Sequence, residues 1–186
     1  MTMKTASAIL SLTALLLTPS PLLADDRPMF VVAGPVSSIT IVNDDGEMSW
    51  EQTFEFDPDG LLTAIDGQEP RIERDTLGRP VKIILDEEDE DGETVTVNYL
   101  LTYVGTTFAV REARTEGADP EGNWTYTYRY DPHTGRALSR TYADPQEPET
   151  FVFAYTAADA DGNWTERTET PDGAEFPVTQ RRILGR

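Results

Sequence analysis

Turns that begin with aspartate and end with glycine recur along this chain, and they constrain its fold more than any other feature of the sequence. Five such turns run from Asp57 to Gly60, Asp75 to Gly78, Asp119 to Gly122, Asp131 to Gly135 and Asp159 to Gly162, and two looser ones run from Asn43 to Gly46 and Asp89 to Gly92. The aspartate carboxylate accepts backbone hydrogen bonds within a turn, and glycine adopts the positive φ from which a new strand can start. Repeated turns of this kind predict successive β-hairpins.

Apolar and polar residues alternate along the segments between these turns, which is the pattern of a strand with one buried face and one wet face. In residues 124–130 one face carries four aromatic residues, Trp124, Tyr126, Tyr128 and Tyr130. Threonine and arginine occupy the other face. Similar alternation runs through residues 94–104 and 151–155. With strands of the usual ~5–6 residues, the sequence predicts an all-β antiparallel meander of about nine to eleven strands.

The first 24 residues differ in composition from the rest of the chain. Lys4 precedes an apolar run over residues 6–17, and prolines follow that run. This order is typical of a secretory signal peptide, so we expect residues 1–24 to be removed after Ala24 and residues 25–186 to form one exported domain, either periplasmic or secreted. The apolar run of about twelve residues is shorter than the ~20 that a helix needs to span a bilayer, which makes a retained anchor the weaker alternative.

The chain carries 34 acidic residues against 15 basic ones, a formal net charge of −19, and no cysteine. Negative charge repels phosphate backbones and anionic lipid headgroups, so we expect no nucleic-acid partner and no membrane insertion of the mature domain, whereas cations stay open as partners. Without disulfides, stability must come from packing. The charge also opposes pairing between exposed sheet edges, and Pro177 near the C-terminal strand is placed to protect one edge. We therefore expect a monomer or a loose dimer.

One stretch of the chain resembles a known repeat. Residues 128–138 read Tyr-Arg-Tyr-Asp-Pro-His-Thr-Gly-Arg-Ala-Leu, which is similar to the YD repeat of the RHS family. In that repeat, tyrosines and an aspartate precede a glycine, an arginine and a leucine. Degenerate copies, and Gly-Asn-Trp-Thr corners of a variant common in short exported bacterial proteins with such repeats, lie at residues 54–62, 72–81, 122–125 and 162–165. The resemblance covers about residues 50–180 in five imperfect copies.

The resemblance implies one β-hairpin per repeat, with the hairpins stacked side by side into a single curled sheet. Large members of the family form shells or fibres at the cell surface, and some carry toxins or bind carbohydrate. This chain has too few repeats to enclose a cargo, and it shows neither a toxin domain nor the glycine-rich self-cleaving core of large members. The resemblance thus implies a non-enzymatic protein with a binding or structural role in the cell envelope or outside it, possessing no family catalytic residue. An envelope protein or a glycan is the partner it suggests.

The aromatic face of residues 124–130, together with one later tryptophan, allows two interpretations. Stacked rings can bind the apolar C–H surface of a sugar, which makes five residues candidates for ligand binding: Trp124, Tyr126, Tyr128, Tyr130 and Trp164. The same rings can instead form the bulky half of the core, because soluble proteins rarely expose apolar stripes of this size. We favour packing, and the burial of the rings distinguishes the two interpretations.

Carboxylates offer two further candidate sites. The densest acidic run contains Glu87, Asp89 and Asp91, whose oxygen atoms suit weak calcium binding, although a solvated acidic loop is the default interpretation. A glycosidase would need two carboxyl groups about 5–9.5 Å apart, and Glu112 and Glu166 lie in alternating segments, where a solvated sheet face is expected. A carbohydrate-binding module or weak glycoside-acting enzyme, and an acidic calcium-binding domain, therefore stay as alternatives to the non-enzymatic role.

The single histidine, His133, lies inside one of the predicted turns. A histidine that activates a nucleophile needs neighbours that hold and orient it, and a hairpin tip supplies none. With one histidine and no cysteine, sites for zinc, iron or copper are not expected. The sequence thus predicts no cofactor other than weakly bound calcium, and no catalytic residue.

Overall fold

The computed structural model describes residues 27–30, 32, 34–88, 92–117, 123–143, 148–172 and 177–186. The predicted signal peptide lies outside these ranges. The described part contains one short 3₁₀ helix, η1 (Arg27–Phe30), and twelve strands. The strands are β1 (Ser38–Asp44), β2 (Ser49–Phe56), β3 (Leu62–Ile65), β4 (Arg71–Arg74), β5 (Pro80–Glu88), β6 (Thr94–Tyr103), β7 (Val110–Glu116), β8 (Thr125–Tyr130), β9 (Ala137–Tyr142), β10 (Glu149–Ala158), β11 (Trp164–Pro171) and β12 (Val178–Gly185). The prediction of an all-β fold is confirmed, with more strands than expected.

All twelve strands belong to one antiparallel sheet with the order β3-β2-β1-β12-β11-β10-β9-β8-β7-β6-β5-β4. From β4 to β12 each strand pairs with the next one in sequence, which is the predicted meander. The first strand then pairs with the last along its whole length, from Ser38 opposite Gly185 to Asp44 opposite Thr179. The edge strands are therefore β3 and β4. The prediction that Pro177 protects an edge is wrong, because Pro177 precedes β12, which lies between β1 and β11.

Alternate connections of a meander lie at the same end of the sheet, and this places four of the predicted turns together. The turns that start at Asp57, Asp75, Asp131 and Asp159 join β2 to β3, β4 to β5, β8 to β9 and β10 to β11. In each turn an aspartate oxygen accepts backbone hydrogen bonds from residues two to four positions later, and the glycine has a φ between 67° and 91°. These four turns are confirmed. The predicted turn at 119–122 lies outside the described residues.

Two arginines that follow the turn glycines connect neighbouring hairpins at this end of the sheet. The guanidinium of Arg79 pairs with the aspartate of its own turn at 2.7 Å and donates to the carbonyl oxygens of Gly105 and Thr107 at 2.9 and 2.6 Å. Those carbonyls belong to the connection between β6 and β7. In the same way Arg136 donates to the carbonyl oxygen of Gly162 at 3.3 Å, in the connection between β10 and β11. Each arginine thus holds one hairpin against the next.

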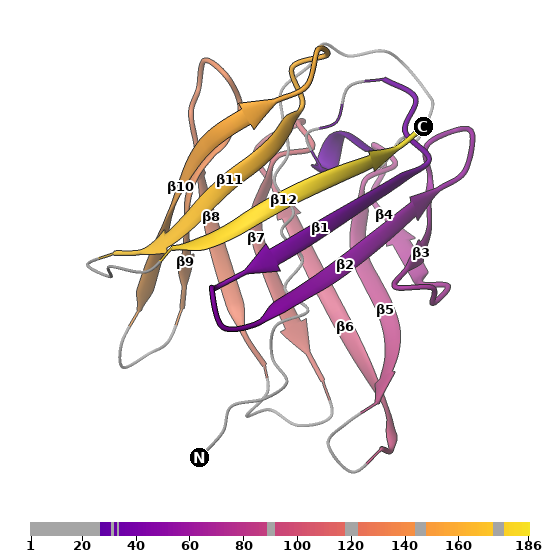
Figure 1. The fold of residues 1–186 in the computed structure, drawn as a ribbon. Helices are drawn as coiled ribbons and strands as arrows, with labels where there is room; N and C mark the ends of the chain where they lie inside the picture. The colour runs from indigo at the N-terminus through magenta and orange to yellow at the C-terminus, as the bar shows by residue number, and fades with distance from the viewer. Residues whose placement is uncertain are drawn as a thin grey trace.

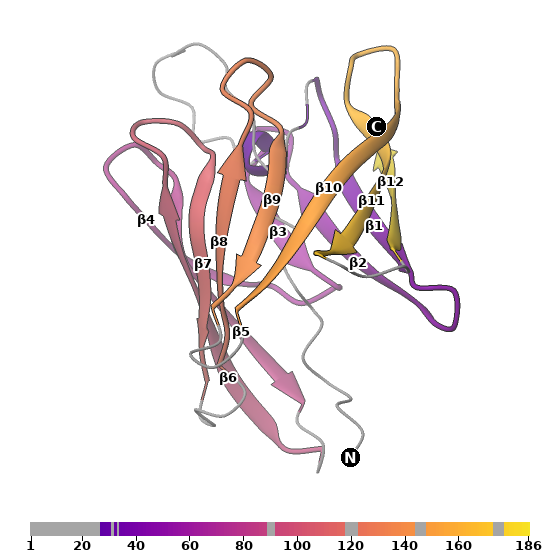
Figure 2. The ribbon, with the colours of Figure 1, turned by 90° about the vertical axis from the view of Figure 1, so that its left-hand side faces the viewer.

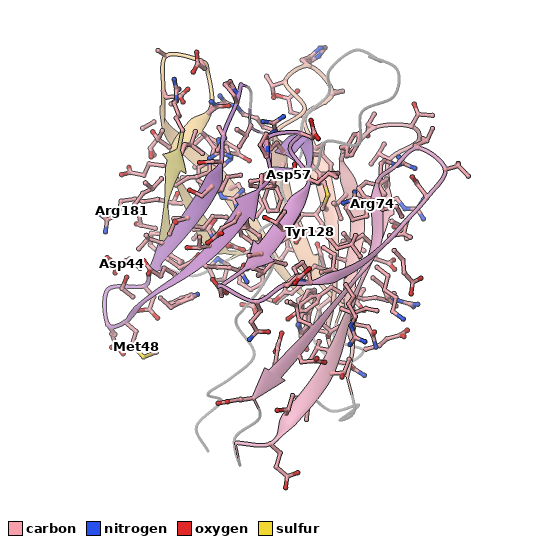
Figure 3. All side chains as sticks on the ribbon, turned by 90° about the vertical axis from the view of Figure 1, so that its right-hand side faces the viewer. Asp44, Met48, Asp57, Arg74, Tyr128 and Arg181 are labelled. Carbon is pink, nitrogen blue, oxygen red and sulfur yellow. The ribbon has the colours of Figure 1, made fainter. Side chains whose placement is uncertain are left out.

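The sheet curls, so that β5–β8 form one wall and β11, β12, β1 and β2 form the wall that faces it (Figure 2). Helix η1 lies between the walls at one end, where the ring of Phe30 packs on Phe54 with 4.5 Å between centroids. Tyr128 also lies between the walls (Figure 3). The buried core includes Met29, Phe30, Ile39, Ile41, Phe54, Ile83, Leu101, Val110 and Tyr128.

Candidate functional site

The inner face of β9, β11 and β12 differs from the rest of the core because it carries charged residues. Arg140 on β9, Arg167 on β11 and Arg182 on β12 are 7%, 0% and 4% exposed, and we call these three residues the arginine cluster. Glu169 on β11 and Gln180 on β12 are buried on the same face. Buried charges are costly unless they are paired and hydrogen-bonded. The partners of these groups therefore decide what this region can do.

The arginine cluster hydrogen bonds to acceptors inside the curled sheet. Arg140 forms an ion pair with the carboxylate of Glu169. Nε of Arg167 donates to Oε1 of Gln180 at 2.5 Å, and Nη1 of Arg182 donates to a main-chain carbonyl oxygen of η1 at 2.5 Å. The amide of Gln180 in turn donates to Glu169 at 3.1 Å. The carboxylate of Glu169 thus lies on a face that carries three guanidinium groups.

Aromatic rings cover these guanidinium groups. Trp164, at the start of β11, lies between two of them, with its ring centroid 4.5 Å from the guanidinium carbon of Arg167 and 4.1 Å from that of Arg182. The guanidinium of Arg140 lies 4.4 Å from the ring centroid of Tyr126. Because the face of an aromatic ring attracts a cation, these contacts offset part of the cost of removing the guanidinium groups from water.

The two ends of the arginine cluster differ in the pKa of their guanidinium groups. Burial, followed by the neighbouring cation of Arg167, lowers the pKa of Arg182 from its ordinary value to about 9. Arg140 behaves differently. Burial acts to lower the pKa of Arg140, but the carboxylate of Glu169 and the neighbouring Tyr128 and Tyr126 together outweigh it, and the pKa is raised. Negative charge therefore compensates the Arg140 end of the cluster more fully than the Arg182 end.

Two buried nitrogen atoms at this face have no hydrogen-bond partner among the described residues. They are Nη1 of Arg140 and Nε1 of Trp164. Leaving a buried N–H without an acceptor costs roughly 1–3 kcal/mol, and native structures contain few such groups. Each of these atoms is therefore a donor that an acceptor from outside the chain would stabilise.

The sheet opens beside Trp164. The register between β11 and β12 runs from Glu166 opposite Arg181 to Glu169 opposite Val178, and Trp164 lies beyond its end. From that point the two strands separate toward the end of the sheet that holds the C-terminus (Figure 1), and we call this opening the seam. A hollow of about 410 Å³ lies here, lined by Val42, Ala157, Thr165, Glu166, Arg181, Arg182 and Ile183. Val42 and Glu166 lie opposite Arg181 in the register, and Arg181 and Ile183 face away from the buried Arg182, so the hollow lies on the outer face of the sheet and the arginine cluster on the inner face.

The five aromatic residues predicted as ligand-binding candidates lie in the core. Tyr126, Tyr128 and Trp164 are buried, and Trp124 and Tyr130 are partly buried against the same hydrophobic cluster. They do not form the exposed strip that a surface platform for sugars would need. The structure brings Tyr126 and Trp164 against the arginine cluster. Trp124 instead packs on Tyr126, with ring centroids 5.1 Å apart.

The acidic residues predicted to bind calcium are only partly described. Glu87 lies on β5, where its carboxylate accepts a hydrogen bond from the hydroxyl of Tyr99. Asp89 and Asp91 lie outside the described residues. Within the described ranges, no group of three or more histidine, aspartate and glutamate side chains is placed to hold a metal ion.

The carboxylates considered for glycoside cleavage lie on separate strands. Glu112 is on β7 and Glu166 on β11, so β8, β9 and β10 lie between them. Four interstrand spacings of ~4.8 Å amount to roughly 19 Å along the sheet, well beyond the ~5–9.5 Å that the reaction needs. His133 is exposed in its turn, where its backbone N–H donates to Asp131. The structure therefore does not bring these candidates together.

The alternating pattern assigns arginine to the wet face of each strand, and so it misses the arginine cluster. One signal was present in β12, where Arg181 and Arg182 are consecutive. Consecutive residues of a strand point to opposite faces, so one of the two must face inward if the strand is central in a curled sheet. The structure shows Arg181 on the outside of β12 (Figure 3), and Arg182 is the buried one.

No protein-family model matches this chain, and no curated protein matches it. In the described part of the chain, no helix combines the length and the apolar character of a membrane span. A function for the chain must therefore be argued from the chemistry of the site.

Proposed function

We propose that this chain is an exported, non-enzymatic binding protein of YD-repeat-like type whose ligand binds at the seam between β11 and β12. The arginine cluster is the observation that carries the proposal. The N-terminal apolar run supports export to the periplasm or the cell exterior, and the acidic composition supports a monomer or a loose dimer.

Burying the arginine cluster costs stability. Even a well-paired buried ion pair is often no more stable than apolar residues of the same volume, because removing charges from water costs several kcal/mol per ion. Most of the other buried side chains are apolar, among them Phe54, Ile83 and Leu101. Residues kept at a cost to stability are commonly those that function requires. A binding function explains why the chain keeps a buried arginine cluster that the packing of the core does not require.

The YD-like residues support a structural role for the repeats. The hydroxyl of Tyr130 donates to the carbonyl oxygen of Val110 at 2.7 Å, which joins β8 to β7. Asp131 accepts hydrogen bonds from the backbone of its own turn, and Arg136 reaches the neighbouring hairpin. Because these side chains connect hairpins, the repeats act as a frame that holds the inner face in position.

Fluorine NMR of the protein labelled with fluorinated tryptophan tests the proposal. The chain has three tryptophans, of which Trp164 lies at the seam, Trp50 lies on β2 and Trp124 precedes β8. The variant Trp164→Phe assigns the signal of interest. The protein is titrated with oligosaccharides, organic cations, neutral alcohols and organic anions. We expect one class to shift the Trp164 signal saturably while the Trp50 signal stays unchanged, and if no class does so the seam is not a binding site.

Separate measurements address the other parts of the proposal. Mass spectrometry of the protein isolated from the producing cells should show a chain that starts at Asp25, and retention of the first 24 residues in the cell would contradict export. Sedimentation should show a monomer or a loose dimer, and long filaments would contradict it. Calcium should leave the melting temperature unchanged. A calcium-dependent rise that Glu87→Gln removes would favour the calcium-binding alternative instead.

A further inference from the structure

We propose that the hollow on the outer face of β11 and β12 binds a small apolar α-amino acid as a zwitterion, with its charged head between Arg181 and Glu166 and its side chain on Ile183. This site is separate from the arginine cluster on the inner face, so the inference goes beyond the proposed function. Three features support it: the bulges beside the hollow, the opposite charges that line it, and its apolar surface.

Two β-bulges lie in the strands beside the hollow. Thr156 is an extra residue on β10, and Thr165 is an extra residue on β11 one register pair later. The hydroxyl of Thr156 donates to the carboxylate of Glu166 at 2.8 Å, and Thr165 lines the hollow. Bulges are common next to active sites, where they redirect a side chain. Both extra residues therefore contribute either to the hollow or to the position of a charged side chain that lines it.

Two side chains of opposite charge line the hollow. Arg181 and Glu166 are directly opposite in the register of β12 and β11, a position in which opposite charges commonly pair with each other. Here Arg181 instead lies 3.8 Å from Asp44 on β1 (Figure 3), and Glu166 accepts its hydrogen bond from β10. The two side chains thus turn toward opposite neighbouring strands, and the hollow offers a cation at one side and an anion at the other.

Both charged groups keep hydrogen-bonding capacity for a ligand. The 3.8 Å between Arg181 and Asp44 is longer than a hydrogen bond, so the guanidinium N–H groups can donate to a carboxylate. The carboxylate of Glu166 offers about four acceptor positions, so it can accept from an ammonium group as well as from Thr156. An α-amino acid carries its carboxylate and its ammonium group on one carbon atom. One such ligand can therefore bind both side chains.

The charges around the hollow act against ligands with a net charge of either sign. The chain has a formal net charge of −19, which opposes an organic anion. The buried guanidinium groups of Arg167 and Arg182 lie on the inner face of the same two strands and oppose an organic cation. A zwitterion has no net charge, and it gains an interaction from both Arg181 and Glu166.

Apolar residues form the rest of the surface that a ligand would cover. Val42 lies opposite Arg181 in the register and Ala157 lies opposite Glu166, so an apolar residue flanks each charged one. Ile183 also lines the hollow and is 61% exposed. The volume of about 410 Å³ lies within the usual range for sites that hold small molecules. An aliphatic side chain on the ligand would cover Ile183.

Carbon-13 NMR of the isoleucine methyl groups of the purified protein tests the inference. The variant Ile183→Val assigns the signal of interest, and the buried Ile41 serves as the internal reference. Norleucine carries both charges, whereas hexanoate lacks its ammonium group, pentylammonium lacks its carboxylate and glycine lacks its aliphatic body. All titrations are run at one ionic strength, because free salt screens charge. We expect saturable shifts of the Ile183 signal, with norleucine binding at least about threefold more tightly than any other probe.

Variants that each remove one charge provide a matched comparison. Glu166→Gln and Arg181→Met remove the charges that line the hollow, and Glu112→Gln and Arg129→Met remove the same charges from β7 and β8. We expect each of the first two to weaken norleucine binding by about threefold to fivefold, and each control to weaken it by less than about 1.5-fold. Equal losses in the two pairs would mean that general charge attracts the probe, and would overturn the inference.

The singly charged probes show which side chain binds which group. Glu166→Gln should leave hexanoate binding no weaker, and Arg181→Met should leave pentylammonium binding no weaker. If hexanoate or pentylammonium binds as tightly as norleucine, the zwitterion inference fails. It also fails if no probe shifts the Ile183 signal. The proposed function is tested separately by the fluorine signal of Trp164, so the failure of one does not imply the failure of the other.

Discussion

Two regions of the interior fill the same curled sheet with different chemistry. Around η1 the inner face is filled by the apolar residues Met29, Phe30, Phe54 and Phe56, and Phe54 is 0% exposed. Around β11 and β12 the positions with the same orientation hold Arg167, Glu169, Gln180 and Arg182, all at most 4% exposed. Alternation therefore decides which positions face inward without deciding which residue types occupy them. Where a costly type occupies such a position, a requirement other than packing is indicated.

The largest effect is expected in the apolar region. Phe54→Ala removes a ring that packs on Phe30 and leaves a cavity, so we expect the free energy of unfolding to fall by about 4 kcal/mol. Val152, which is 48% exposed, serves as control, and Val152→Ala should change that free energy by less than about 0.5 kcal/mol. Urea unfolding followed by circular dichroism measures both values. Similar losses in the two variants would show that the apolar region does not depend on tight packing.

In the charged region, a single substitution should lower the free energy of unfolding more than a paired substitution does. Glu169→Leu removes the buried carboxylate and leaves Arg140 without its ion-pair partner, so we expect a loss of about 3 kcal/mol. The double variant Arg140→Met with Glu169→Leu should lie within about 1 kcal/mol of the parent, because apolar residues replace the buried pair. The same urea experiment measures both. A double variant at least as unstable as Glu169→Leu would mean that the fold itself needs these charges.

The two arginines at the turn end of the sheet, Arg79 and Arg136, should differ in how much they contribute to the free energy of unfolding. Arg79 is buried and makes an ion pair and two carbonyl hydrogen bonds, so Arg79→Met should lower the free energy of unfolding by about 2 kcal/mol. Arg136 is partly exposed and makes one long hydrogen bond, so Arg136→Met should cost only about 0.5 kcal/mol. Chemical unfolding of the two variants gives the comparison. Equal losses would show that exposure does not govern the strength of these links.

The smallest effects are expected in the titration of tyrosines. Burial raises the pKa of Tyr126 to about 12, while the cation of Arg140 acts against it. Burial and the carboxylate of Glu87 raise the pKa of Tyr99. Arg140→Met should therefore raise the pKa of Tyr126 further, and Glu87→Gln should lower that of Tyr99. Absorbance of tyrosinate in site-specific Tyr→Phe backgrounds measures both shifts, and a shift of either in the opposite direction would contradict these assignments.

The same tyrosines set the alkaline limit of the wild-type protein. A group whose pKa is higher in the folded state stabilises the protein below its unfolded pKa, and this stabilisation is lost as the pH rises through the folded pKa. For Tyr126 this window runs from 10.0 to about 12. We expect the free energy of unfolding to fall across that window, and constant stability up to pH 12 would show that Tyr126 ionises as freely in the folded state as in the unfolded one.

Much of the fold could be predicted because its signals are local. The Asp-to-Gly turns depend on hydrogen bonds within four or five residues, and the alternation of residues 124–130 correctly separates inward tyrosines from outward Arg129. The pairing of β1 with β12 could not be predicted this way, because it joins residues about 140 positions apart and no local pattern encodes it. The edge-protecting role predicted for Pro177 fails for the same reason, because pairing with β1 makes β12 a central strand.

The site was harder to predict than the fold, because it depends on a departure from the rule that predicts the strands. Alternation predicts that Tyr126 belongs to an inner or binding face, and Trp164 is the later tryptophan predicted to join that face. Both lie against the arginine cluster. It placed arginines on the wet face, since burial of a charge is normally too costly. Only the three-dimensional register, which sets Arg167 opposite Gln180, shows that the charges are inside.

Hydrogen exchange at the arginine side chains measures whether the guanidinium groups of the arginine cluster lie inside the sheet. NMR of the Nε–H groups in the wild-type protein measures it for each arginine. We expect exchange at Arg140, Arg167 and Arg182 to be slowed by at least about tenfold relative to the outward-facing Arg181. Exchange at the same rate in all four would place the cluster in water and would contradict the proposed site.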